Sequence, residues 1–418
     1  MILFSHPTGN ANVRQAALGL EEAGLLGEFW TCLAPQARDL WVRVLPASMR
    51  ARFMRRSLPE PLYVRTRSRP WRELGRFAAE YFGQSQLIRH EHGAFSVDAV
   101  YRDLDAAVAR RIRQASQEFS AVYAYEDGAA ESFRAAQQRG LAKFYDLPIG
   151  YWRVWRDMLA EEAQREPEWA ATLQGARDSE EKLARKDEEL RLANTIFVAS
   201  SFSKRTLSAA PAGGEIHVVP YGSPQLAIGD LQDNQNDSLR VLFVGALSQR
   251  KGLSYLLRAI GLLNRHVRLT MIGVRPSVLC QPLDRALREH AWIPSLPHRE
   301  ILDQMRQHDV LVFPSLFEGF GLVILEAMSQ GLPVITTPHT GGADVIENGE
   351  DGFLIDIRSA EEIAVALEQL AGDRNRLLAM KYAARAKAGT LRWSNYRQKL
   401  SMLISQSDSA KISNEGMA

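Results

Sequence analysis

Cysteine is almost absent from this 418-residue chain, which has only Cys32 and Cys280. Two cysteines are too few for a disulfide framework, so we expect the chain to work in a reducing compartment. No apolar run reaches the length of a transmembrane helix. The first apolar strand, Ile2 to Ser5, follows Met1 directly and leaves no room for a signal peptide. These absences predict a cytoplasmic location.

An excess of either charge is also missing, because the formal net charge is only +2. This balance gives no global reason to expect nucleic acid as a partner. A metal site is not indicated either: Asp103 and Asp105 stand two residues apart in a predicted helix, where their side chains diverge. We therefore expect no metal and no cofactor. The length suffices for two ordinary domains, each with its own core.

One stretch, residues 309–336, organises the rest of the chain. An apolar run, Val310 to Phe313, has the length of a strand, and residues 322–330 predict a helix that ends at Gly331. A second buried strand begins at Pro333. A strand, a helix and a returning strand form a βαβ unit, and such units build parallel sheets covered by helices. The predicted fold class is therefore α/β.

The turn inside this unit, Glu318-Gly319-Phe320-Gly321, carries the chemistry. Its glycines let the backbone approach a ligand, and the helix that begins at Leu322 presents unpaired N–H groups and a positive dipole end. Both features favour an anionic ligand such as a phosphate. Glu326 lies on the same helix among apolar residues, where a carboxylate is costly unless it is hydrogen-bonded. Two readings stay open for it: a ligand contact, or a carboxylate that reaches solvent or a structural arginine.

The segment FPSLFEGFGLVILEAMSQGLPVITT, in which seven residues separate Glu318 from Glu326, resembles the donor-site signature of the family 4 retaining glycosyltransferases. This resemblance implies the GT-B fold, in which two Rossmann-like doubly wound domains face a cleft and a C-terminal helix returns to the N-terminal domain. It also implies a nucleotide-sugar donor and no metal. The predicted parts are an acceptor-side domain over 1–222, a donor-binding domain over 223–390 that begins with a polar linker over 225–238, the returning helix over 391–405, and a flexible tail over 406–418.

The resemblance assigns roles within the motif. Glu326 is expected to accept hydrogen bonds from ribose hydroxyls, and Glu318 from sugar hydroxyls. The predicted catalytic residues are Glu318, Lys251 and Arg250, and the predicted donor-binding residues are Glu326, Gly319, Phe320, Gly321, Leu322, Gly245 and Leu296.

Lys251 and Arg250 follow a predicted strand at 240–244. Two adjacent cations at the foot of a helix suit a pyrophosphate, since arginine offers a fork and lysine a point charge. Relatives commonly carry an arginine directly after the glycine that corresponds to Gly245, but this chain has Ala246 there. We expect Arg250 to substitute from the other end of the loop. Without the Glu318 motif, two surface cations at a turn would be an equal reading.

The acceptor-side candidates are Gly9, Asn10 and Glu126. The resemblance implies Gly9 and Asn10, because the corresponding first loop of family 4 enzymes faces the cleft, whereas Glu126 is placed at the carboxyl end of a predicted strand. Ligands collect at the carboxyl ends of strands in open α/β sheets. Glu126 is predicted either to act on an acceptor hydroxyl or to cap the next helix, and for Asp127 capping is favoured. Relatives often carry a histidine at the end of the strand that corresponds to 142–148, where the nearest positions of this chain hold Asp146 and Pro148. The role of that histidine is therefore not transferred.

Two charged stretches remain. Residues 38–76 hold eleven arginines and no lysine, interleaved with aromatic and aliphatic side chains. Three interpretations stay open for them: a solvated face with stacked arginines, an anionic membrane surface or anionic acceptor, and nucleic acid, the least favoured. Residues 178–193 alternate in charge at helical spacing, which predicts a solvated helix face.

Beside these features, the resemblance implies a retaining glycosyltransferase that moves a sugar from a nucleoside-diphosphate sugar to a glycan, a lipid-linked acceptor or another hydroxyl. The protein would be cytoplasmic or peripheral to the inner face of the membrane. One alternative is a nucleotide-sugar epimerase of the same architecture, which would convert the donor without transfer. Another is a non-catalytic glycan- or membrane-binding relative, which any turnover of donor would exclude.

Overall fold

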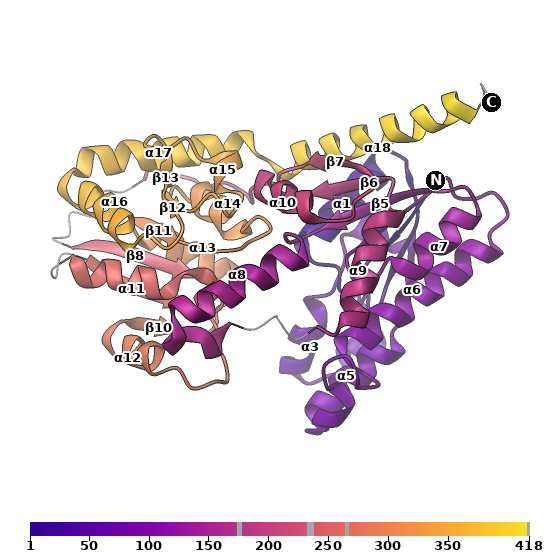
Figure 1. Cartoon of the computed structure of the whole chain (residues 1–418), viewed down its shortest axis with the longest axis horizontal. Helices are drawn as coiled ribbons and strands as arrows, with labels where there is room; N and C mark the ends of the chain where they lie inside the picture. The colour runs from indigo at the N-terminus through magenta and orange to yellow at the C-terminus, as the bar shows by residue number, and fades with distance from the viewer. Residues whose placement is uncertain (174–177, 232–237, 264–266, 416–418) are drawn as a thin grey trace.

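Two parallel sheets, one from each half of the sequence, make up the protein (Figure 1). The computed structural model describes residues 1–173, 178–231, 238–263 and 267–415. Part of the predicted polar linker, residues 232–237, lies outside them. Within the described residues no helix is both long enough and apolar enough to span a bilayer.

The first sheet has its strands in the order β3-β2-β1-β4-β5-β6-β7, all parallel. Its strands are β1 (Ile2–Ser5), β2 (Leu26–Thr31), β3 (Thr66–Ser68), β4 (Ala121–Tyr125), β5 (Ala142–Leu147), β6 (Thr195–Val198) and β7 (Glu215–Val218). The central strands are buried along their whole length, as expected for a parallel sheet with helices on both faces. Phe4, Tyr123 and Phe197 stack across three of them, with ring centroids 4.8 Å and 5.8 Å apart.

The second sheet repeats this order as β10-β9-β8-β11-β12-β13. Its strands are β8 (Leu239–Val244), β9 (Val267–Ile272), β10 (Ala291–Ile293), β11 (Val310–Phe313), β12 (Val334–Thr336) and β13 (Gly352–Leu354). In both sheets the strand order reverses once, between β1 and β4 and between β8 and β11. This is the doubly wound arrangement that the sequence predicted.

Helices cover the faces of both sheets. In the first half they are α1 (Ala11–Glu22), α2 (Leu40–Arg43), α3 (Ala47–Met54), α4 (Glu60–Tyr63), α5 (Trp71–Tyr81), α6 (Val97–Gln114), α7 (Ala130–Gln138), α8 (Trp152–Arg165), α9 (Glu180–Leu192) and α10 (Ser201–Thr206). In the second half they are α11 (Leu253–Leu262), α12 (Gln281–Glu289), α13 (His298–Gln307), α14 (Leu322–Ser329), α15 (Gly342–Val345), α16 (Ala360–Gly372), α17 (Arg374–Thr390) and α18 (Trp393–Glu415).

The last helix, α18, returns to the first half of the chain and packs against α1, as predicted (Figure 1). Gly19 allows the close approach, because a Cβ atom there would lie 2.9 Å from Cβ of Arg397. Ser401 Oγ donates to the carbonyl of Gly19 at 2.8 Å, and Arg397 donates to Glu22 at 2.7 Å. The helix extends through Glu415 and so includes most of the residues that we predicted as a tail.

Helix α8 crosses in the opposite direction, from the first half of the sequence to the second sheet. Glu162 of α8 is fully buried and accepts hydrogen bonds from Gln249, Tyr255 and Arg358 of the second half, all at 2.8 Å. Trp169, in the short helix that follows, belongs to the apolar core of the second sheet. Two segments, α8 and α18, therefore tie the halves together, and the domain boundary at 222/223 stays a prediction.

The prediction of a solvated face for residues 178–193 holds for one side of the helix only, where Glu180, Glu181 and Arg191 are exposed. In α9 the charged residues Lys182, Lys186, Asp187 and Glu189 are all buried. Glu189 accepts hydrogen bonds from two backbone N–H groups of the β4–α7 turn and from a tyrosine of β5. Distant segments thus supply the partners of Glu189, so the other side of this helix is packed against the first half of the chain.

Candidate functional site

The candidate residues lie where the strand order of each sheet reverses. In the first sheet, the turn after β1 holds Gly9 and Asn10, and the turn after β4 holds Glu126. In the second sheet, the turn after β8 holds Arg250 and Lys251, and the turn after β11 holds the 318–321 motif. Crevices at the carboxyl ends of strands at such a reversal are where open α/β sheets bind ligands. The topology therefore provides one candidate site in each half.

The loops after β8 and β11 are in direct contact. Gly252 has φ 71° and immediately precedes α11, and a Cβ atom there would lie only 2.1 Å from the carbonyl oxygen of Pro314. Gly245 directly follows β8 and lies next to Gly273, where a Cβ atom would lie 1.7 Å from the Gly245 carbonyl oxygen. Glycine is thus required for these backbones to approach each other. The approach brings the cations of one loop to the carboxylate of the other.

Lys251 and Arg250 both pair with Glu318. Lys251 Nζ contacts Oε2 of Glu318, and Arg250 Nη1 lies 3.0 Å from the same oxygen. Arg250 Nη1 also donates to the carbonyl of Phe317 at 2.9 Å. Burial lowers the pKa of Lys251 to about 8, although Glu318 acts in the opposite direction. Burial acts to raise the pKa of Glu318, but the two cations outweigh it and the pKa is lowered.

The rest of the motif is fixed by the first half of the chain. A Cβ atom on Gly319 would lie 1.8 Å from the carbonyl of Pro148, and Ser200 Oγ donates to the Gly319 carbonyl at 2.5 Å. Gly321 has φ 83° and stands just before the first residue of α14, Leu322. Phe320 is buried between the halves. The N-terminus of α14 is thereby held beside the Glu318 cluster.

Glu326, one turn into α14, meets His298 at the start of α13. The His298 Nε2 and Glu326 Oε1 atoms are 2.9 Å apart, and the hydrogen bond to Glu326 raises the pKa of His298. Leu296 lies two residues before His298 and packs partly against the central core. No signal in the sequence indicates this pairing with His298, because no periodicity links α13 with α14.

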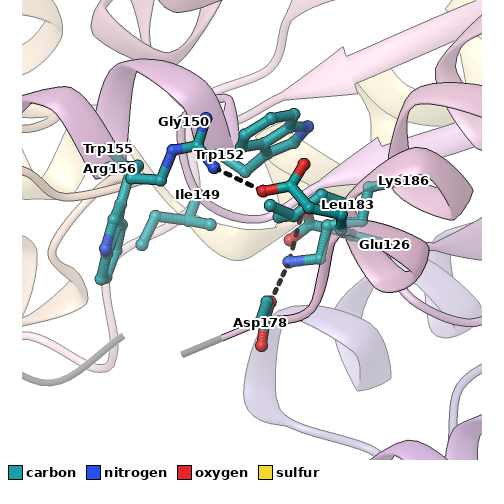
Figure 2. A pocket seen from close by; sticks show the side chains of 10 residues that line it. Glu126, Ile149, Gly150, Trp152, Trp155, Arg156, Asp178, Leu183 and Lys186 are labelled. Carbon is teal, nitrogen blue, oxygen red and sulfur yellow. Dashed lines mark hydrogen bonds and ion pairs between the residues drawn. The ribbon is translucent and has the colours of Figure 1, made fainter. Parts of the chain in front are cut away.

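Glu126 lines a pocket of about 280 Å³ at the ends of β4 and β5, between α8 and α9 (Figure 2). Lys186 Nζ lies 3.5 Å from Glu126 and 3.3 Å from Asp178. Trp152 and Trp155 supply aromatic walls. Burial raises the pKa of Glu126, while Lys186 lowers it.

This pocket adjoins the cation loop of the second half. The Arg250 guanidinium lies 5.3 Å from the ring centroid of Trp155, and that ring packs edge-on against Phe317 at 5.1 Å. A Cβ atom on Gly150 would lie 2.6 Å from the Phe317 ring. Trp155 was not among the predicted residues, and α8 carries no motif that would indicate it.

Gly9 and Asn10 line a different pocket. The Nδ1 atom of His6 accepts from the backbone N–H groups of Thr8 at 3.0 Å and Gly9 at 3.2 Å, which fixes the turn after β1. Gly9 has φ 60°, and Asn10 precedes α1. The structure therefore groups Glu318, Arg250 and Lys251 together, but places Glu126 and the Gly9–Asn10 turn in separate pockets.

The predicted capping role of Asp127 is wrong. Helix α7 begins after Ala129, and its first N–H groups are bound by the carboxylate of Asp105, which accepts from Glu131 and Ser132 at 2.7 Å and 2.9 Å. Asp127 has φ 72°, and its carboxylate faces the lysines of α9. A carboxylate from another helix replaces the local cap.

Asp146, at one of the positions where relatives often carry a histidine, is a core residue. Asp146 is buried, and its Oδ2 accepts from Tyr123 Oη at 2.7 Å. Burial raises the pKa of Asp146 to about 7. It does not take a histidine's place in the cleft.

One group of potential metal ligands occurs in the described part of the chain. His90, Glu91 and Asp178 have ligand atoms within 4.8 Å of one another. Asp178 pairs with Lys182 at 3.0 Å, and Glu91 accepts from the Ser179 backbone at 2.9 Å. Both carboxylates already have protein partners.

Two facing doubly wound units, with cations and a helix N-terminus gathered at one reversal point, define a GT-B architecture. Residues 231–387 match the family model for glycosyl transferases group 1. The family model thus assigns this part of the chain, most of its second half, to the group 1 glycosyl transferases.

Similar proteins agree with this assignment. The chain is 29% identical over 187 residues to the D-inositol 3-phosphate glycosyltransferase of Paenarthrobacter aurescens, a match that covers 40% of this chain and 46% of the relative. The matched segment therefore spans about half the length of that relative. Sucrose-phosphate synthase from Thermosynechococcus elongatus has a similar structure, with TM-score 0.66, 18% identity and coverage of 98% and 99%. Anabaena Alr3699/HepE in complex with UDP-glucose gives TM-score 0.58, 17% identity and coverage of 97% and 99%.

Proposed function

We propose that this protein is a retaining glycosyltransferase that transfers a sugar from a nucleoside-diphosphate sugar to a hydroxyl acceptor. The observation that carries the proposal is the convergence of Arg250 and Lys251 on Glu318, beside the N-terminus of α14. Two cations and a helix dipole suit a diphosphate, and a carboxylate between them suits sugar hydroxyls.

The geometry supports an exchange of partners when the donor binds. The donor diphosphate would draw Lys251 and Arg250 away from Glu318, and the freed carboxylate would accept from sugar hydroxyls. Backbone N–H groups near Gly321 and Leu322 would face the same phosphates. Glu326 would accept from the ribose, with His298 orienting its carboxylate. As the sugar–phosphate bond breaks, charge develops on the diphosphate, where the cations stabilise it.

For the sugar ring of the acceptor we propose the crevice that faces this loop. The pocket around Glu126 adjoins Arg250 through Trp155, and aromatic walls of this kind suit sugar rings. Among the structural relatives, one was solved in complex with UDP-glucose. Uridine-diphosphate sugars are therefore the first donors to test.

The test measures donor binding by thermal shift and turnover with a panel of nucleotide sugars. We expect Glu326→Gln to weaken donor binding and Glu318→Gln to lower turnover, because an amide turns part of a buried acceptor into a donor. Lys251→Ala and Arg250→Ala should each cost about 2 kcal/mol or more in transition-state stabilisation. Glu350→Gln and Lys204→Ala, at exposed positions outside the site, serve as matched controls.

Two outcomes would overturn the proposal. Unchanged kinetics in folded Glu318→Gln and Lys251→Ala variants would place the site elsewhere. Conversion of a nucleotide sugar to its epimer in the absence of any acceptor would indicate the epimerase alternative. If Lys251 alone mattered, Arg250 would be a surface residue and not the substitute for the arginine missing at Ala246.

A further inference from the structure

Five arginines line one pocket beside the turn after β1. The pocket has a volume of about 410 Å³, and its floor includes the Gly9–Asn10 turn. The arginines come from α1, from the end of α3 and the residues after it, and from α5: they are Arg14, Arg52, Arg55, Arg56 and Arg76. Segments far apart in sequence thus bring like charges to one place.

A single aromatic ring holds three of these guanidinium groups. Arg52, Arg76 and Arg56 lie 4.4 Å, 5.1 Å and 5.5 Å from the ring centroid of Phe77. Cation–π contacts stabilise each group, but the three charges repel one another across the ring. An anion in the pocket would relieve that repulsion.

The protein's own carboxylates do not balance the cluster. Glu73 pairs with Arg56 and Arg76, and Glu80 pairs with Arg52 and Arg76. Five guanidinium groups against two carboxylates leave an excess of three positive charges. Among the described residues, Nη1 of Arg56 is buried with no hydrogen-bond partner. Donor capacity therefore remains in the pocket.

Helix α1 and the turn before it add to the positive potential. The N-terminus of this 12-residue helix carries the positive end of its dipole, and it begins at the pocket. Burial, together with the charge of Arg56, lowers the pKa of His6 to about 3. The imidazole is therefore neutral at physiological pH and accepts the turn's N–H groups, so the turn is held in place.

The pocket lies close to the donor motif. Asn12, in the first turn of α1, donates from Nδ2 to Tyr221 Oη at 3.1 Å. The Tyr221 ring packs edge-on against Phe320 of the motif at 5.3 Å. One aromatic side chain thus separates the start of α1 from the donor loop.

We propose that this arginine pocket binds a phosphate group of the acceptor substrate. The proposal rests on the proposed transferase function. Guanidinium forks match phosphate oxygens in pairs, and arginine keeps its charge at every physiological pH. A phosphate held there would orient the acceptor hydroxyl towards the donor loop. The phosphate could belong to a soluble sugar phosphate or to a lipid-linked phosphate, which share this chemistry.

Binding is tested first without any turnover. Inorganic phosphate is titrated into the full chain by calorimetry, at constant ionic strength set with sodium chloride. We expect the affinity to persist in Lys251→Ala, which removes the donor-site cation, and to fall at least tenfold in the double variant Arg52→Gln/Arg55→Gln. Both of these arginines are exposed, so the buried Arg56–Glu73 pair remains intact. The matched control, Arg65→Gln/Arg67→Gln, removes two exposed arginines of the same stretch that do not line the pocket.

Turnover then tests the acceptor. Each neutral sugar acceptor is compared with its phosphorylated counterpart, and a soluble sugar phosphate with a polyprenyl phosphate-linked sugar in detergent. We expect kcat/KM to favour the phosphorylated form at least tenfold, and this preference to be lost in Arg52→Gln/Arg55→Gln through a higher KM. The acceptor that is turned over identifies the source of the phosphate.

Three results would overturn the inference: phosphate affinity lost only in Lys251→Ala, affinity unchanged in the double variant, or equal use of neutral and phosphorylated acceptors. The proposed transferase function has a test of its own. It predicts that the wild-type chain slowly hydrolyses the donor when no acceptor is present. Absence of hydrolysis and transfer with phosphate binding intact would refute the transferase and leave the anion pocket standing.

Discussion

Glu162 of helix α8 accepts a hydrogen bond from Gln249 Nε2 at 2.8 Å, and this contact joins the first half of the chain to the cation loop of the second. Gln249 immediately precedes Arg250 and Lys251, and its own backbone N–H donates to Thr172 Oγ1 at 2.9 Å. The loop that we propose to hold the donor diphosphate is therefore positioned by residues of the acceptor-side half.

A first prediction tests this positioning. Glu162→Gln should lower the free energy of unfolding by about 1–3 kcal/mol, because Arg358 loses a buried charged partner. It should also lower kcat/KM through the displaced loop. The neighbouring Glu161 pairs with the same Arg358 at 2.9 Å but is half exposed, so Glu161→Gln should change stability by less than about 1 kcal/mol. Urea unfolding and donor kinetics of both variants check this, and equal effects would contradict it.

A second prediction concerns pH. Because the pKa of Lys251 is about 8, the free protein loses this cation as pH rises through 8, and kcat/KM should fall by about tenfold per pH unit above that value. Lys251→Arg keeps the charge and should abolish the alkaline decline, whatever its absolute rate. Glu318→Gln should move the decline to lower pH, since Glu318 raises the pKa of Lys251. A decline that persists in Lys251→Arg would assign it to another group.

A third prediction uses the buried carboxyl of Asp146. Its pKa is raised to about 7, so between pH 4 and 7 the native state holds a proton that the unfolded state releases. The free energy of unfolding should therefore fall as pH rises across this window. The Asp146→Asn variant should lose this pH dependence of the free energy of unfolding. At pH 8 it should be more stable than wild type by up to about 4 kcal/mol, but at pH 4 it should not. Urea unfolding at both pH values checks this, with exposed Asp157→Asn as control.

Much of this fold could be predicted from the sequence, because its strands are buried on both faces and read as short apolar runs. Val310–Phe313 stands as predicted, and the residues that begin and end α14 follow from Gly321 and the 330–331 turn. The resemblance also implied that Lys251 and Glu318 share one site, and the two side chains are paired in the structure.

The remaining contacts depend on packing between distant segments, which no local pattern encodes. Asp105 caps a helix other than its own, and Lys186 faces Glu126 across a pocket. His298 reaches Glu326 from a neighbouring helix. In each case a charged side chain meets a partner more than twenty residues away, so neither spacing nor propensity could indicate the pair.

The arginine stretch, residues 38–76, has two parts that differ in their surroundings. Its later arginines pair with carboxylates or line the pocket beside Phe77. Its first part does not: Leu40 and Val44 are 78% and 82% exposed, next to exposed Arg43 and Arg50. Among the described residues no carboxylate lies within ion-pair distance of these two arginines. Exposed apolar and cationic side chains in one short segment are typical of a membrane-surface contact.

A last prediction follows for residues 38–50. The purified protein should co-sediment with anionic but not neutral vesicles at low salt, since each arginine near an anionic surface contributes about 1 kcal/mol. The attraction should weaken as salt rises, because charges are screened within about 10 Å at 0.1 M. Arg38→Glu/Arg43→Glu/Arg50→Glu should abolish binding, whereas the control Arg268→Glu/Arg285→Glu/Arg288→Glu, on exposed arginines of the second half, should not. Equal binding to neutral vesicles, or equal loss in both triple variants, would show that this segment does not recognise an anionic membrane.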